Sequence, residues 1–124
     1  NNMFFDFNAE KLTLIDPNGA FFGHWLYDVS KLTHSMIGKF DFIDTRLFNL
    51  NGAVPLVYSS GTGELEDLFR KQILDDLTPQ QLRLVYKTTA SLFASMQPLH
   101  KDFPEKTVLF EAAFESFNRL ADSV

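Results

Sequence analysis

The stretch that decides the fold is KLTLIDPNGAFFGHWLYDVSKL, from Lys11 to Leu32. A short apolar run, Leu12 to Ile15, predicts a β-strand that ends on the carboxylate of Asp16. Residues 17–19 (Pro-Asn-Gly) then stop the strand and turn the chain. A second carboxylate, Asp28, follows where a helical pattern begins. The stretch therefore predicts strand, turn and helix, with one acid at each junction.

Asp16 has two interpretations. A carboxylate held at the end of a strand beside a glycine turn can bind a divalent cation, because Mg²⁺ prefers carboxylate oxygens. The same residue can simply open an Asp-Pro-Asn-Gly turn, since these four residue types dominate turns for backbone reasons. The spacing alone favours the turn.

Composition limits the classes of protein to which the chain can belong. Its 124 residues suit one domain, 1–124, and its 14 phenylalanines predict an aromatic core. The formal charge of −5 argues against a nucleic-acid partner, and no apolar run is long enough to cross a membrane. The lack of cysteine excludes thiolate chemistry and fits a reducing compartment, so we expect a cytoplasmic protein.

The N-terminal third predicts a β-hairpin and a helix. Asn2 to Phe7 is the first strand and Leu12 to Ile15 the second, joined by a short polar turn. A helix begins at Asp28, a plausible N-cap, and ends at Gly38. Because the chain opens at Asn1 directly in a strand-like run, we expect a piece of something larger.

The rest of the chain predicts mainly helices. Phe40 to Leu50 fits a short helix, whereas Val54 to Tyr58 fits an edge strand or extended segment. Glu64 to Leu77 predicts a helix with its apolar residues on one stripe, namely Leu65, Leu68, Phe69, Ile73 and Leu77. Thr78-Pro79 starts a helix that runs to about Met96, and a last helix begins near Pro104.

Other catalytic signatures are missing from the sequence. His24, His34 and His100 lack metal-ligand spacing, so we expect each to be a surface or capping residue. No serine stands in a nucleophile elbow. The segment from Ser59 to Gly63 is not followed by Gly-Lys-Ser or Gly-Lys-Thr, so we interpret it as a flexible linker rather than a phosphate loop.

Two segments between residues 11 and 35 resemble the aminoglycoside-phosphotransferase and choline-kinase superfamily. They are Leu14-Ile15-Asp16-Pro17-Asn18-Gly19 and the pattern Gly23-x-x-x-Tyr27-Asp28-Val29-x-Lys31-Leu32-x-His34-Ser35. The resemblance is closest to sugar-kinase-like members linked to polysaccharide biosynthesis. The segment from Pro98 to Pro104, before the last helix, is also similar to the C-terminal end of that subfamily.

The resemblance implies a fold and a set of roles. The chain would be mainly α with a β-hairpin near its N-terminus, the lower part of a protein-kinase-like C-terminal lobe. Residues 1–19 would form the hairpin and metal-binding loop, and residues 26–124 the helical subdomain. Asp16 would hold Mg²⁺ against the phosphates of ATP, with Asn1, or Asn2 after a one-residue shift, as second ligand. Asp28 would brace the catalytic loop, a structural role.

The resemblance also implies an activity, the transfer of the γ-phosphate of a nucleotide to a hydroxyl of a small molecule of sugar, choline or aminoglycoside type. The catalytic base and the nucleotide-binding N-terminal lobe are not in this chain, so it should be inactive alone. Asn18 stands where the family commonly has Arg, and His24-Trp25 where it has Asp-Pro. These departures leave two alternatives, a degenerate kinase-like binding module or an unrelated helical interaction domain.

Overall fold

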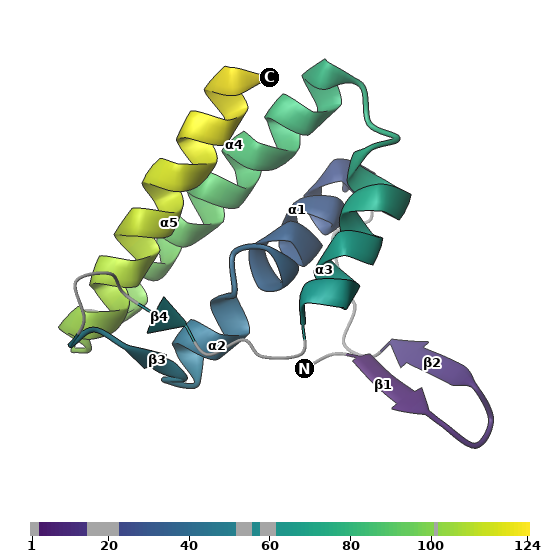
Figure 1. Ribbon diagram of the computed structural model, residues 1–124, viewed down its shortest axis with the longest axis horizontal. Helices are drawn as coiled ribbons and strands as arrows, with labels where there is room; N and C mark the ends of the chain where they lie inside the picture. The colour runs from purple at the N-terminus through teal and green to yellow at the C-terminus, as the bar shows by residue number, and fades with distance from the viewer. Residues whose placement is uncertain (1–2, 15–22, 52–55, 58–61, 101) are drawn as a thin grey trace.

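The computed structural model describes residues 3–14, 23–51, 56–57, 62–100 and 102–124. Most of this chain is helical, which confirms the mainly α prediction, and Figure 1 shows the helices grouped beside a separate β-hairpin. The elements in order are β1 (Met3–Asp6), β2 (Lys11–Leu14), α1 (Trp25–Met36), α2 (Phe40–Asp44), β3 (Phe48–Asn49), β4 (Leu56–Val57), α3 (Gly63–Phe69), the π-helical turn η1 (Arg70–Leu74), α4 (Pro79–Met96), the 3₁₀ turn η2 (Pro98–His100) and α5 (Pro104–Ser123).

The predicted N-terminal hairpin is confirmed. Strands β1 and β2 pair antiparallel, with Met3 opposite Leu14 and Asp6 opposite Lys11. At the turn, the Asp6 carboxylate accepts hydrogen bonds from the backbone N–H groups of Asn8 (2.9 Å) and Ala9 (3.1 Å). A short acidic side chain that accepts hydrogen bonds from backbone N–H groups two and three residues later stabilises a turn locally. The turn of this hairpin is therefore determined by its own sequence.

Helix α1 begins three residues earlier than predicted, and Asp28 is not its N-cap. His24 takes that position, because its backbone is extended and its Nδ1 accepts a hydrogen bond from the N–H of Leu26 at 3.2 Å. Asp28 is an exposed residue of the first turn instead. Histidine is not among the usual N-cap residues, so the sequence pattern predicted the next short acidic residue, Asp28, as the N-cap.

The predicted end of α1 at Gly38 is confirmed. The N–H groups of Ile37 and Gly38 both donate to the carbonyl of Thr33 at 3.0 Å. The glycine is needed for space: a Cβ at Gly38 would lie 2.6 Å from the His34 carbonyl oxygen and from two ring carbons of Phe93. Helices α1 and α4 therefore approach closely at this point.

The prediction of one helix over Phe40 to Leu50 is wrong in its second half. Helix α2 stops at Asp44, and β3 (Phe48–Asn49) then pairs antiparallel with β4, which confirms a strand within Val54 to Tyr58. The helix ends because Arg46 is left-handed (φ 62°) and the N–H of Leu47 donates back to the Phe42 carbonyl at 2.8 Å. The Arg46 guanidinium lies 4.5 Å from the centre of the Phe103 ring, a contact that stabilises this uncommon conformation.

The helix predicted over Glu64 to Leu77 is shorter and irregular. The α-helical part ends at Phe69 and continues as η1, where the N–H of Asp75 donates to the Arg70 carbonyl five residues back at 2.9 Å. This π-helical turn contains one residue more than an α-helical turn. Leu74 is therefore buried in the core, and Ile73 stays partly exposed. Of the predicted apolar stripe, Phe69 is buried, whereas Leu65 and Leu68 are exposed.

Helices α4 and α5 form the main layer of the structure and are well predicted. They run side by side in opposite directions, and α1 packs against α4 (Figure 1). Thr78 and Gln81 form a capping box at the start of α4, with Pro79 in its first turn. The core between these helices contains Leu26, Val29, Ile43, Phe69, Leu74, Val85, Tyr86, Ala90, Phe93, Leu109, Phe110, Phe117 and Ala121.

Candidate functional site

The predicted metal ligands lie, in the sequence, just outside the part of the β-hairpin that the structure describes. The outermost described pair of the hairpin is Met3 and Leu14. Asn1 comes two residues before that pair and Asp16 two residues after it. Both residues lie outside the described part of the chain, as does Asn2. The prediction that Asp16 and Asn1 bind Mg²⁺ therefore stays a prediction.

Asp28, the third predicted site residue, is described, and it is exposed on the first turn of α1. Within the described ranges, no hydrogen bond or ion pair involves its carboxylate. An acid in the first turn of a helix interacts favourably with the helix dipole. The described residues also contain no group of three or more His, Asp or Glu side chains arranged to hold a metal ion.

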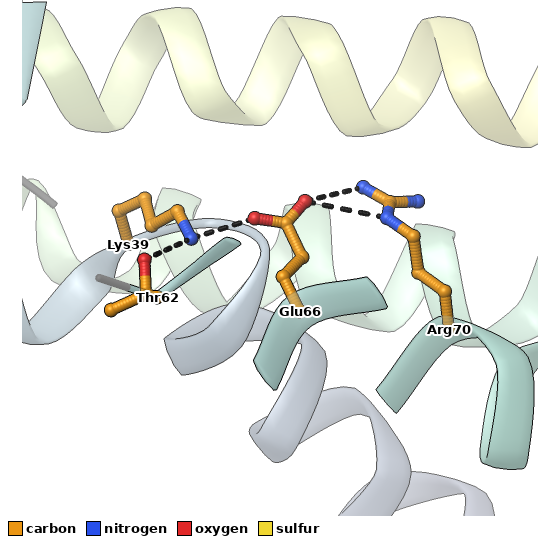
Figure 2. Close-up of polar contacts among 4 residues, drawn as sticks. All are labelled: Lys39, Thr62, Glu66 and Arg70. Atoms are coloured by element: carbon orange, nitrogen blue, oxygen red, sulfur yellow. Dashed lines mark hydrogen bonds and ion pairs between the residues drawn. The ribbon is translucent and has the colours of Figure 1, made fainter. Parts of the chain in front are cut away.

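Three polar features that the sequence analysis did not predict lie elsewhere among the helices. The first is a cluster around Glu66 on α3 (Figure 2). Lys39 donates to Glu66 Oε2 at 2.7 Å and to the Thr62 hydroxyl at 3.2 Å, while Arg70 Nη2 donates to Glu66 Oε1 at 2.9 Å. Burial of Glu66 would raise the pKa of its carboxyl group, but the hydrogen bonds from Lys39 and Arg70 outweigh it and lower that pKa overall.

The Glu66 cluster connects segments that are far apart in the sequence. Lys39 lies between α1 and α2 in a left-handed conformation (φ 57°), and Glu66 is 27 residues further along the chain. Both side chains are mostly buried, with 17% and 23% of their surface exposed. The cluster therefore fixes the start of α3 against the end of α1.

The second feature is a cluster where α2 meets α5. Lys106, buried near the start of α5, donates through Nζ to the Asp44 backbone carbonyl at 2.6 Å and to its carboxylate at 3.1 Å. His100 Nε2 is 3.7 Å from the same carboxylate. A buried ammonium group needs such partners, because an unpaired charge in the interior is costly. These contacts pair the polar groups at the C-terminal end of α2, so the cluster has a structural role.

The third feature is a single side chain, His34 of α1. Its ring is 3% exposed and lies between the rings of Phe40 (4.4 Å between centroids) and Phe93 (4.2 Å). Its Nε2 is buried with no hydrogen-bond partner in the described structure. Burial, with a smaller contribution from the charge of Lys31, lowers the pKa of His34 to about 4. The imidazole is therefore neutral at pH 7.

Sequence reasoning missed these features because no local pattern marks them. Glu66 and Arg70 are four residues apart, a spacing that suggests a helical ion pair, but the position of Lys39 comes from tertiary packing. The interpretation of His34 as a surface or capping residue is wrong, since the ring is buried. The rings that cover it come from α2 and α4, and the sequence does not show that these helices meet at His34.

The comparisons with known proteins do not assign the chain to a family. No family model, no curated protein and no solved structure matches it. Within the described residues, none of the helices has the length and apolar character required to cross a membrane.

Proposed function

We propose that the chain is part of a Mg²⁺- and ATP-dependent phosphotransferase that phosphorylates a hydroxyl group of a small molecule, and that it forms the lower part of a kinase-like C-terminal lobe. The proposal rests on the resemblance of residues 11–35 to the aminoglycoside-phosphotransferase and choline-kinase superfamily. The observation that supports it most is the register of the N-terminal hairpin.

The register relates the two proposed ligands to each other. Met3 is opposite Leu14 in the last described pair, and Asn1 and Asp16 each stand two residues beyond that pair in the sequence. The register thus supports the same pair of ligands that the resemblance implies.

The donor set suits the proposed cofactor. A carboxylate from Asp16 and an amide oxygen from Asn1 are hard ligands, and Mg²⁺ usually takes one or two protein ligands, with phosphate and water oxygens completing its shell. When bound, the ion would neutralise charge on the phosphates, which is the main requirement for phosphoryl transfer. Asp28 and the helices that follow would support the lobe, and the catalytic base would come from another part of the protein.

The proposal predicts that Asp16→Ala weakens Mg²⁺-dependent nucleotide binding in the full-length protein by at least about tenfold, because even partners of metal ligands contribute 10–100-fold to metal affinity. Calorimetric titration of ATP with and without Mg²⁺ measures this effect. Glu10→Gln is a matched control, since Glu10 is an exposed acid at the opposite end of the same hairpin. The control should bind like wild type.

Three results separate the alternatives. Tight Mg²⁺-dependent binding with phosphoryl transfer to a hydroxylated acceptor supports the phosphotransferase. Binding without transfer to any acceptor indicates a degenerate kinase-like module. If Asp16→Ala binds as wild type does, or if neither protein binds nucleotide, Asp16 is a turn residue and the proposed function is wrong.

A further inference from the structure

Helix α3 carries an apolar face that the rest of the described structure leaves uncovered. Leu65 and Leu68 are 53% and 48% exposed, although they belong to the stripe that predicted a buried helix face. Residues three apart are neighbours on a helix, so the two side chains form one continuous patch. Two adjacent, half-exposed leucines offer an apolar contact surface on this short helix.

The exposure is not the result of a loosely held helix. On its inner side, α3 buries Phe69, and η1 buries Leu74. The Glu66 cluster fixes its first turn to Lys39 (Figure 2). The orientation of α3 is therefore determined, and it directs Leu65 and Leu68 towards solvent.

Two carboxylates lie along one edge of this face. Glu64 is four residues before Leu68, hence its neighbour on the helix, and Asp67 is three residues after Glu64 in the same row. Both acids are exposed, and no ion pair to either is found among the described residues. Over residues 63–77 the acids outnumber the cations: Glu64, Glu66, Asp67, Asp75 and Asp76 against Arg70 and Lys71. Most of the formal net charge of −5 is therefore concentrated in this segment.

We propose that Leu65 and Leu68, with Glu64 and Asp67 at their edge, form a docking face for a basic amphipathic helix of a partner protein. Apolar side chains of the partner would cover the two leucines, and its Lys or Arg residues would pair with the two acids. A second copy of the chain at this face would bring like charges together, and the anionic surface of a membrane would be repelled for the same reason. This proposal does not depend on the phosphotransferase proposal.

A synthetic helical peptide built only from leucine and lysine, with leucines at amphipathic spacing, is a suitable probe. Titrated into the full chain, it should shift the NMR amide signals of residues 63–69 most, and its affinity should fall as salt is raised. The double variant L65S/L68S should bind at least about tenfold more weakly, as expected for the central apolar residues of an interface. E64Q/D67N should bind more weakly and lose much of the salt dependence.

The controls use residues of the same kind at other places. Leu84 of α4 is 49% exposed, so L84S removes an equally exposed leucine and should leave binding unchanged. D102N/E111Q removes two exposed acids elsewhere and should keep the salt dependence. The proposal is overturned if L84S weakens binding as much as L65S/L68S, or if a peptide with glutamate in place of lysine binds equally well. It is also overturned if the chain dimerises, or binds phosphatidylcholine vesicles, through the two leucines.

Discussion

Acidification from pH 6.5 to pH 4 is expected to remove about 3 kcal/mol from the free energy of unfolding through His34 alone. In the native state the ring is 3% exposed between Phe40 and Phe93, and its pKa is lowered to about 4. In the unfolded chain the pKa returns to about 6.5. Burial of the neutral ring is tolerated, whereas burial of the cation is not.

The sign follows from proton binding. Between pH 4 and pH 6.5 the unfolded state binds a proton at His34 that the native state does not, so protons favour unfolding in this window. The stabilisation is present above the unfolded-state pKa of about 6.5, is lost progressively as the pH falls towards the native-state pKa of about 4, and levels off below it. Urea unfolding followed by circular dichroism at a series of pH values measures this slope.

Substitution isolates the contribution of His34. His34→Leu keeps an apolar side chain of similar size and removes the titrating group, so the stability of the variant should depend much less on pH between 4 and 6.5. His24→Asn is the control, because it keeps a side-chain acceptor at the exposed N-cap of α1. An unchanged pH dependence in His34→Leu would show that His34 is not the responsible group.

The second large effect is expected where α1 and α4 approach each other. Gly38→Ala should cost about 1–3 kcal/mol, because the new Cβ would lie 2.6 Å from the His34 carbonyl oxygen and from the ring of Phe93. Phe93 has little freedom to move, since it is fully buried with Phe110 and Phe117 at 6.0 and 5.9 Å between ring centroids. Phe93→Ala alone should cost about 3–5 kcal/mol.

A double-mutant cycle tests this contact. Because the methyl group that Gly38→Ala adds would occupy part of the space that Phe93→Ala empties, the combined loss should be smaller than the sum by about 0.5–3 kcal/mol. Gly63→Ala is the control, since an added Cβ there meets no atom within 4 Å. Its stability should be unchanged or slightly higher. Additive losses at Gly38 and Phe93 would contradict the close approach of the two helices.

The parts of the fold that the sequence predicted well are those with local signals. Helix α4 has a capping box at Thr78 and a long periodic stripe, and the N-terminal hairpin has two strands with a polar turn between them. Strand β3 was predicted as helix because its pairing partner, β4, is separated from it in sequence and no periodicity within Phe40 to Leu50 reveals that pairing. The end of α2 was not predicted because the left-handed residue that follows the helix is Arg46, whereas a sequence pattern identifies such a position by a glycine.

The candidate site was less predictable than the fold. The sequence pointed to Asp16, Asn1 and Asp28 through a resemblance, and of these the structure describes Asp28, which is exposed and not an N-cap. The polar clusters around Glu66 and Asp44 depend on side chains that tertiary packing brings together. Sequence spacing contains no information about such contacts. The exposure of Leu65 and Leu68 on α3 could not be predicted from the sequence either, because it depends on how α3 packs against the other helices.

The most direct test of the proposed metal site is paramagnetic broadening by Mn²⁺, which prefers the same oxygen ligands as Mg²⁺. With ATP bound to the full-length protein, the amide signals of Met3 and Leu14 should broaden far more than those of Asn8 and Ala9. The reason is distance: Asn8 lies five residues from Met3 and Ala9 five residues from Leu14, along strands that rise about 3.3 Å per residue. Equal broadening at both ends of the hairpin, or none at Met3 and Leu14, would contradict a metal ion held by Asp16 and Asn1.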